Sequence, residues 1–353
     1  MKHLNKILVA VVTLTFNFQL STFNCFGQDI HFSQTYFSPL ELNPANAGAE
    51  FDLRAGLNYR TQWGSVTEPF VTMMAGYDMN FKSSKPKVGY FAGGINVFND
   101  KAGDSKMNQT QANLAVAYHL YLNDKNTLGA GIQGGYFQRA IDMSGLTWGS
   151  QYNGQRYDDQ IASGESVAAT SVKAIDFSSG LTWTYRKGER YMSGNDQVLL
   201  IGGLSLQHVN NPKTEYNNIK DDPLYYRWIG HFHGIIGVPN SPISFMPAVV
   251  YLHQGSLSEV LVGANFAYKF KEASKYTGNM KGAAIGLGGQ YRLKDAFVIT
   301  SFIEISNYTI GVSYDLNTSD LSSASKSYGA FEVALRYVYP SPFGGSKSSA
   351  RFR

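Results

Sequence analysis

Residues 70–81 read FVTMMAGYDMNF, and this stretch decides the fold. Because successive side chains of a β-strand point to opposite faces, a strand here has one apolar and one polar face. The same alternation recurs to the end of the chain, in segments of about ten residues edged by Tyr and Phe. The apolar positions are Val71, Met73, Ala75, Tyr77, Met79 and Phe81, and the polar or small ones are Thr72, Gly76, Asp78 and Asn80.

Residues 1–28 have the pattern of an export signal. Two lysines and a histidine precede an apolar stretch over 7–20, and small and polar residues follow up to Gln28. This predicts a secretory signal peptide cut near Gln28. The apolar stretch is too short and too interrupted to favour the alternative, an N-terminal membrane anchor. Cys25 is expected to leave with the signal, so the mature chain has no thiol for a disulfide or a metal site.

The amino-acid composition distinguishes a transmembrane β-barrel from a soluble β-sandwich. Of the 353 residues, 43% are hydrophobic, 14% aromatic and only 16% charged. A soluble domain usually carries about 25% charged residues. A soluble β-sandwich also alternates, but its outward face is charged, whereas here the apolar face ends in aromatic side chains. We therefore predict an all-β fold, a transmembrane antiparallel β-barrel in the outer membrane. The net charge of +4 is too small to indicate a nucleic-acid partner.

About fourteen segments carry the strand pattern, an even number, as in single-chain bacterial barrels. They place the barrel over residues 53–339, after an N-terminal segment over 29–52 and before a C-terminal tail over 340–353. Pro247 cannot donate to a ladder, so its strand is expected to start late or to carry a bulge. The stretch 296–305 is apolar on both faces. The predicted strands are 53–60, 70–81, 88–98, 109–121, 127–139, 174–185, 197–208, 227–238, 243–253, 259–270, 283–291, 296–305, 308–316 and 329–339.

The connections predict how the barrel is oriented. With an even strand number both termini lie on the periplasmic side, so odd-numbered connections are the longer outer loops. The two longest, 140–173 and 209–226, are both odd-numbered. Three even-numbered connections carry basic clusters, which we interpret as solvated turns. The alternative is contact with an acidic periplasmic partner or with lipid phosphates. The basic residues are Lys82, Lys85, Lys87, Arg186, Lys187, Arg190, Lys271 and Lys275.

The segment 29–52 contains Pro39 and Pro44 and so cannot be one regular strand. Two interpretations remain, a disordered periplasmic leader or an ordered segment folded into the lumen as a plug. Its aromatic residues, Phe32, Tyr36, Phe37 and Phe51, are too many for a typical disordered segment, which favours the plug. A plug would block diffusion through the barrel.

Polar and charged residues gather on the predicted inner face, where they can pair or meet water. On the lipid face each charge would cost about 2–4 kcal/mol at mid-membrane. Leu114→Arg or Val333→Arg is therefore expected to impair assembly more than Asn113→Arg. The predicted lumen residues are Arg54, Arg60, Asp78, Gln111, Asn113, Asp176, Gln207, Arg227, Lys269, Glu332 and Arg336.

No catalytic, cofactor-binding or metal-binding residue is predicted. Residues 129–134 (GAGIQG) match a dinucleotide glycine pattern, but no helix pattern follows, so close packing within a strand explains the glycines better. His231 and His233 share a strand face but lack a third metal ligand, so we interpret them as lumen-facing. Residues 99–104 have the composition of a calcium loop without its spacing, and turn chemistry explains them. A lipase-like Ser and His pair has no support in the sequence.

A series of short motifs runs through the mature chain in order. They are 29–34 (DIHFSQ), 38–39 (SP), 43–48 (NPANAG), 57–63 (LNYRTQW), 99–103 (NDKAG), 117–120 (AYHL), 146–152 (LTWGSQY), 176–178 (DFS) and 313–323 (SYDLNTSDLSS). Together they resemble the PorP/SprF family of type IX secretion outer-membrane proteins. The tail over 340–353 is a departure, because family members commonly stop soon after the last strand.

The resemblance implies a non-enzymatic, integral outer-membrane component of the type IX secretion system of Bacteroidetes. The implied role is docking of a secreted protein through its C-terminal sorting domain, or linkage of the translocon to periplasmic machinery. Large adhesins and, in some members, gliding motility depend on such proteins. The implied partners are that secreted protein, other type IX components and outer-membrane lipid, with no cofactor. The alternative function, supported only by the barrel, is a channel for a small or apolar solute.

Overall fold

The computed structural model describes residues 29–65, 68–82, 88–103, 107–142, 146–164, 171–188, 195–213, 223–271, 282–319 and 322–339. Several predictions lie outside these residues. They are the signal peptide over 1–28, the tail over 340–353, and part of the basic turns, including Lys85, Lys87, Arg190 and Lys275.

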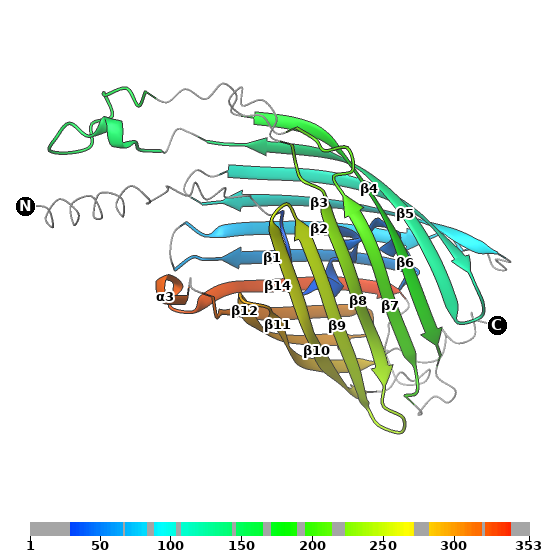
Figure 1. Ribbon diagram of the computed structural model, residues 1–353. Helices are drawn as coiled ribbons and strands as arrows, with labels where there is room; N and C mark the ends of the chain where they lie inside the picture. Colours follow the sequence, from blue (N-terminus) through cyan, green and yellow to red (C-terminus); the bar gives the residue numbers. More distant parts are fainter. Residues whose placement is uncertain are drawn as a thin grey trace, which may run out of the picture.

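The described residues form a closed barrel of fourteen antiparallel strands (Figure 1). Each strand pairs with its neighbours in the sequence, and β1 pairs with β14 from Leu53↔Tyr339 to Gln62↔Ala330, which closes the ring. The strands are β1 Leu53–Gln62, β2 Phe70–Asn80, β3 Gly89–Ala102, β4 Met107–Tyr121, β5 Asn126–Ala140, β6 Ser171–Lys187, β7 Val198–Gln207, β8 Arg227–Gly237, β9 Ile243–Gln254, β10 Leu257–Lys271, β11 Ala283–Arg292, β12 Ala296–Ile305, β13 Tyr308–Asn317 and β14 Tyr328–Tyr339. The predicted fold class and every predicted strand are confirmed.

Two local predictions are wrong. Residues 99–102 belong to the end of β3, where the Thr72 hydroxyl donates to Asp100 Oδ1 at 2.6 Å. Among the described residues of this run, 99–103, only Gly103 has the expected turn conformation, with φ +60°. Pro247 neither delays nor bulges β9. The ladder with β8 passes from His233↔Ala248 to Ile236↔Phe245 in unchanged register, while Pro247 pairs with Ala264 on the other side. The missing N–H of Pro247 thus interrupts the ladder between β8 and β9, but it shifts the register of neither this ladder nor the one between β9 and β10.

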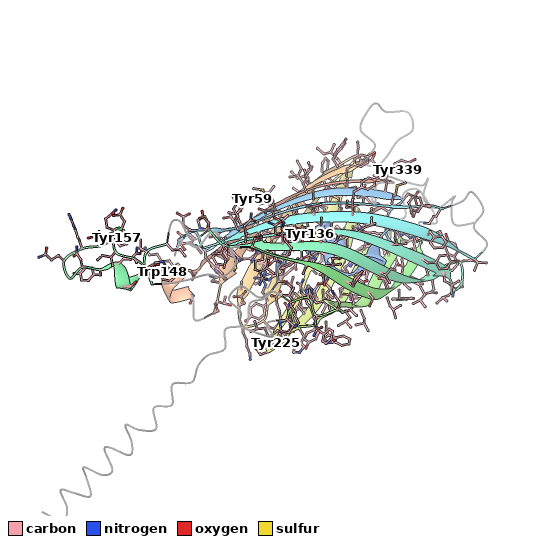
Figure 2. All side chains as sticks on the ribbon, turned by 90° about the horizontal axis from the view of Figure 1, so that it is seen from above. Tyr59, Tyr136, Trp148, Tyr157, Tyr225 and Tyr339 are labelled. Carbon is pink, nitrogen blue, oxygen red and sulfur yellow. The ribbon has the colours of Figure 1, made fainter. Side chains whose placement is uncertain are left out.

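The outer face of the barrel has the order that a bilayer requires. Aliphatic side chains such as Leu114 and Ile132 are exposed along the middle of the strands. Aromatic side chains are exposed toward both ends, and Figure 2 shows Tyr59, Tyr136 and Tyr339 on the wall. Aromatic girdles flanking an apolar band are typical of outer-membrane barrels. One group is Phe91, Tyr118, Trp183, Tyr268 and Tyr308, and the other is Tyr136, Trp228, Tyr251, Tyr291 and Tyr328.

The two ends of the barrel differ in their connections. We call the end at which odd-numbered strands finish the loop end, because the connections over 141–170 and 208–226 lie there. The opposite end, with the short connections over 122–125 and 306–307, is the turn end. β1 begins and β14 ends at the turn end. None of the helices in the described part of the chain has the length and apolar character that a membrane crossing needs.

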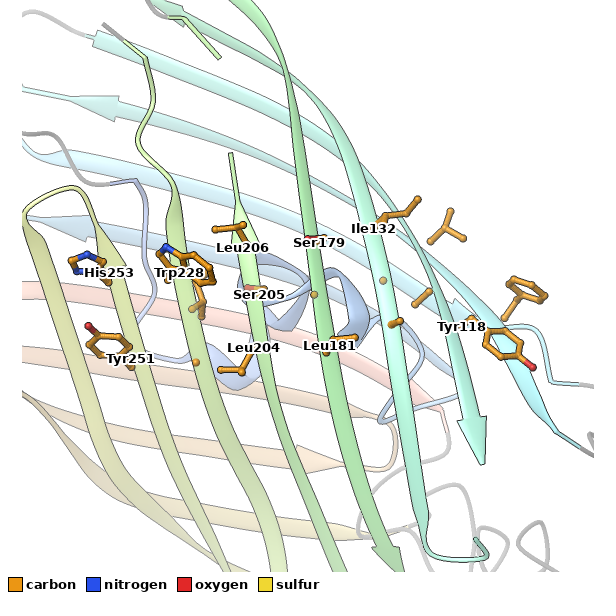
Figure 3. A pocket seen from close by; sticks show the side chains of 18 residues that line it. Tyr118, Ile132, Ser179, Leu181, Leu204, Ser205, Leu206, Trp228, Tyr251 and His253 are labelled. Carbon is orange, nitrogen blue, oxygen red and sulfur yellow. The ribbon is translucent and has the colours of Figure 1, made fainter. Parts of the chain in front are cut away.

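The segment before β1 lies inside the ring. It forms three short helices, η1 Thr35–Phe37, α2 Pro39–Leu42 and η2 Pro44–Asn46. Every residue from Phe32 to Phe51 is buried. Figure 3 shows this segment behind the strands, within the barrel. Its contacts reach β1 and β14 on one wall and β4, β5 and β6 on another.

Candidate functional site

The N-terminal segment crosses the lumen from one end to the other. Asp29 contacts His208, directly after β7, and Gln254, at the end of β9, and both lie at the loop end. At the turn end the Asp52 N–H donates to the Tyr339 carbonyl at 2.9 Å, and the Asn80 N–H donates to the Asp52 carbonyl at 3.0 Å. The strand series therefore begins and ends at one end, as predicted, whereas residue 29 lies at the opposite end. The sequence prediction that both termini share one end fails for this residue.

Near the loop end the backbone of the segment is held by a buried ion cluster around Ser33. The N–H groups of Ser33 and Gln34 donate to the two carboxylate oxygens of Glu332, at 2.6 and 3.0 Å. Arg60 pairs with Glu332 and, at 3.1 Å, with Asp315. Since charged hydrogen bonds are the stronger kind, this cluster fixes the segment firmly to β1, β13 and β14.

Arg292 joins the same cluster from β11. Its guanidinium lies 3.1 Å from Asp315 and 3.4 Å from Glu259, and it also donates to the Ser33 hydroxyl. Each buried cation therefore faces buried carboxylates, which is what makes charge tolerable in a place with little water.

A second cluster holds the middle of the segment to the strands β7 and β8. Arg227 donates to Glu41 Oε1 at 2.8 Å, to the Ile30 carbonyl at 2.9 Å and to Gln207 Oε1 at 3.2 Å. The Gln207 side chain donates in turn to the Glu41 carbonyl at 2.6 Å. Arg227 and Gln207, both predicted to face the lumen, thus bind the segment directly.

The first residue of the segment is held by His208. Its Nε2 lies 2.6 Å from Asp29 Oδ2, and its Nδ1 lies 3.0 Å from Asp176 Oδ1. Burial alone would lower the pKa of His208, but the two carboxylates outweigh it and raise the pKa to about 10. Burial would raise the pKa of Asp29, yet the charge of His208 holds it well below its usual range. The pair is therefore ionised at neutral pH.

At the turn end the segment is held by Arg54 and Asp78. Arg54 Nε donates to Asp78 Oδ1 at 2.7 Å, and the Gly48 N–H donates to Asp78 Oδ2 at 2.8 Å. Arg54 also lies 3.3 Å from Glu50. Arg186 donates to the carbonyls of Ala49 and Glu50, at 3.2 and 2.8 Å. The sequence predicts Arg186 in a solvated basic turn, and this prediction is wrong, because Arg186 lies near the end of β6 and binds the segment inside the barrel.

Between these polar levels the segment packs against apolar lumen residues. The Tyr36 ring lies 6.5 Å from the Phe302 ring, and Leu42 forms a buried cluster with Val298, Ile229 and Val250. This contact explains why the stretch 296–305 is apolar on both faces, since Val298 and Phe302 face the segment and not water.

Wall glycines make room for the segment. A Cβ on Gly131 would lie 2.6 Å from the Ala45 backbone nitrogen, and a Cβ on Gly203 would lie 2.7 Å from Asn43 Nδ2. The close-packing interpretation of the 129–134 glycines is thereby confirmed. The wall and the segment fit each other closely over the middle of the lumen.

Ten of the eleven predicted lumen residues are buried on the inner face, and Lys269 is half-buried. His231 and His233 face the lumen as predicted, with His231 Nε2 lying 3.2 Å from Asn43 Nδ2. Among the described residues no group of three or more His, Cys, Asp or Glu side chains could hold a metal ion. The sequence did not single out Ser33, Glu41 or Asn43 as anchors, although the apolar inner face of 296–305 was a sign that something covers it.

The loop end carries a compact arm over residues 146–164. The Gln151 N–H donates to the Trp148 carbonyl at 2.9 Å, and its side chain donates to the Ile161 carbonyl at 3.0 Å. Tyr152 and Tyr157 form an antiparallel bridge and are 58% and 46% exposed. Figure 2 shows Trp148 and Tyr157 well away from the strands. The arm thus presents aromatic side chains beyond the barrel.

The outer wall has a hollow of about 850 Å³ over strands β3 to β9. Figure 3 shows Leu181, Leu204 and Trp228 around it. Small residues, Ala130 and Gly230, lie among these larger ones. Its exposed lining side chains, among them Leu204 and Trp228, place the hollow on the outward face of the wall.

A closed ring with an apolar girdled exterior and a charged interior defines an outer-membrane β-barrel. A sequence model of the type IX secretion system membrane protein PorP/SprF matches residues 24–337. The chain therefore belongs to the PorP/SprF family, as the sequence motifs indicated, and is a membrane protein of type IX secretion.

No curated protein matches the chain in sequence. Solved barrels resemble it distantly. CdiB from Acinetobacter baumannii has 10% identity and a TM-score of 0.40 over 82% of this chain, which spans 60% of the CdiB chain. A Pseudomonas aeruginosa FadL homologue has 10% identity and a TM-score of 0.40, covering 84% of this chain and 93% of its own. The TodX deltaS2S3 mutant, a monoaromatic hydrocarbon channel, has 10% identity and a TM-score of 0.42 with the same coverage.

Proposed function

We propose that this protein is a non-enzymatic docking component of the type IX system that holds a large secreted protein at the cell surface. The secreted partner would bind through its C-terminal sorting domain, and adhesins that serve surface retention or gliding are the expected cargo. Other type IX components in the outer membrane and periplasm are the further partners. Export through a signal peptide cut near Gln28 belongs to the same proposal.

The single observation that carries the proposal is the occupied lumen. The segment 29–52 is anchored by buried charges near both ends of the barrel, at Glu332 and at Asp78. Displacing it would take Glu41 from Arg227 and Asp29 from His208, and would remove the N–H donors of Glu332 and Asp78, which is costly in a buried place. We therefore assign the segment the role of a permanent plug, so that the barrel offers surfaces and not a passage.

Recognition then falls to the surfaces outside the membrane. The arm over 146–164 is suited to it, because it is internally hydrogen-bonded and exposes Tyr152 and Tyr157. Tyrosine is enriched at the energetic centres of protein interfaces. The charge pattern of the arm, with Arg156 beside Asp158 and Asp159, supplies polar groups around these rings.

Affinity purification of the protein from its own outer membrane tests the proposal. We expect one large secreted protein with a C-terminal sorting domain to copurify with the wild type. The double variant Tyr152→Ser and Tyr157→Ser is expected to recover about tenfold less of it, since hot-spot residues contribute this much. The matched control is Tyr226→Ser, an exposed tyrosine at the same end outside the arm. Failure of the wild type to recover any secreted protein would contradict docking.

The alternative is a channel for a small or apolar solute. It predicts stepwise conductance or solute uptake by the wild-type barrel, whereas the docking proposal predicts neither. Both outcomes can be measured on the same purified protein.

A further inference from the structure

The most unusual feature of the chain path is the position of its first described residue. β1 begins at the turn end, so a segment of ordinary leader type would leave the barrel there. Residue 29 instead lies at the loop end, beside the ends of β7 and β9. In a chain that starts at residue 29, the first residue therefore lies at the loop end, whereas the last strand, β14, ends at the turn end.

The place where Asp29 lies is a built site. Its carboxylate accepts from Gln254 Nε2 at 2.8 Å and lies 2.6 Å from His208 Nε2. Its backbone N–H donates to Gln254 Oε1 at 3.1 Å. The side-chain amide of Gln254 therefore binds both the backbone N–H and the carboxylate of Asp29. His208 is held from behind by Asp176, which also accepts from Gln111 at 3.2 Å.

The charges around this site are arranged for an aspartate. The cations facing Asp29 are His208 and Arg227, and the further carboxylates nearby are Asp176 and Glu41. Asp176 is occupied by His208, and Glu41 is occupied by Arg227. Asp29 is thus the second carboxylate on His208, bound to the ring nitrogen that Asp176 leaves free.

We propose that the loop end contains a binding site for the chain's own N-terminal aspartate, built from His208, Gln254 and Asp176. The α-amino group of the mature protein is therefore displayed at the loop end, on the side of the outer loops. This rests on the proposed signal cut near Gln28, which creates that amino group. If Asp29 is the first residue, its backbone nitrogen is an ammonium group. An ammonium still has an N–H to donate to Gln254 Oε1, so the site can bind a free N-terminus.

Single-cysteine labelling tests the position of the terminus. In a Cys25→Ser background, a Gly-Cys-Gly insertion directly before Asp29 is compared with two reference variants. Ser256→Cys lies in the exposed turn between β9 and β10 at the loop end, and Asp124→Cys lies in the exposed turn between β4 and β5 at the turn end. Intact cells are treated with a membrane-impermeant maleimide, and labelling is compared with that of denatured protein.

We expect the inserted cysteine to be labelled like Ser256→Cys and unlike Asp124→Cys. Labelling like Asp124→Cys, or no labelling before denaturation, would overturn the proposal. The mass of the purified chain separately tests the signal cut, and partner capture separately tests docking, so the failures are distinguishable.

A second measurement tests the site itself. His208→Gln removes the charge that faces Asp29, whereas His253→Gln changes a half-buried histidine at the same end that contacts Ser258 Oγ at 2.8 Å. We expect amide exchange over residues 29–34 to become about tenfold faster or more in His208→Gln, because a lost buried pair opens the structure locally. His253→Gln is expected to leave it unchanged. Equal exchange in both variants would show that the site does not hold Asp29.

Discussion

The two faces of the same strands obey different rules. On the outer face, Leu114 and Ile132 need only be apolar, because lipid adapts to any shape. On the inner face, Arg60, Gly131 and Arg227 each fit one particular group of the N-terminal segment. The outer face thus requires only apolar residues at alternate positions, whereas the inner face requires residues that fit the N-terminal segment. Substitutions on the two faces should therefore destabilise the barrel for different reasons.

The largest effect is expected from breaking the inner ion cluster. Arg60→Ala leaves Asp315 and Glu332 partly unpaired and is expected to lower the free energy of unfolding by about 3–5 kcal/mol. Urea titration of the barrel in lipid vesicles measures it. Arg139→Ala is the control, because Arg139 is half-buried and donates to the neutral Gln109 at 2.8 Å. Similar losses in the two variants would contradict a specific role for the cluster.

The next effect tests the outer face. Leu114→Arg places a charge in lipid near the middle of β4 and is expected to cost about 2–4 kcal/mol. Asn113→Arg faces the lumen, beside Gln111 and Asp176, and is expected to cost less. The folded fraction on unheated gels compares the two. Equal losses would count against the register of β4.

A smaller effect is expected from crowding the segment. Gly203→Leu directs its side chain toward Asn43 and His231, and overpacking of this kind costs about 1–3 kcal/mol. Gly202→Leu is a matched control one residue away, where the nearest atom to a new Cβ is Phe232 Cδ2, at 3.4 Å. The same urea titration measures both variants. Lower stability of Gly202→Leu would show that the inner wall tolerates change better than the outer wall.

The smallest effect concerns pH. His208 has its pKa raised from 6.5 to about 10, so its pairing stabilises the folded state fully below pH 6.5 and is lost as the pH rises through about 10. The stability difference between the wild type and His208→Gln is therefore expected to shrink between pH 7 and about 10.5. Urea titrations at several pH values measure it. A difference that stays constant or grows with pH would contradict the ion pair.

The sequence predicted the strands well because alternation and aromatic edges are local signals. The predicted lumen residues, from Arg54 to Arg336, were found only from the alternation of side chains along each strand. The anchors of the segment escaped prediction because Ser33, Glu41 and Asn43 act through backbone groups and distant strands, which leave no local pattern. The inner apolar residues Val298 and Phe302 were visible in the sequence, yet their partner was not, because it lies more than two hundred residues away in the chain.

The central claim is that the N-terminal segment closes the lumen, and conductance in planar lipid bilayers tests it most directly. The wild-type protein is expected to show no stepwise current, and a folded variant lacking residues 29–46 is expected to show steps, because the ring itself stays closed through β1 and β14. Steady ohmic conductance of the wild type, equal to that of the deletion variant, would contradict the account.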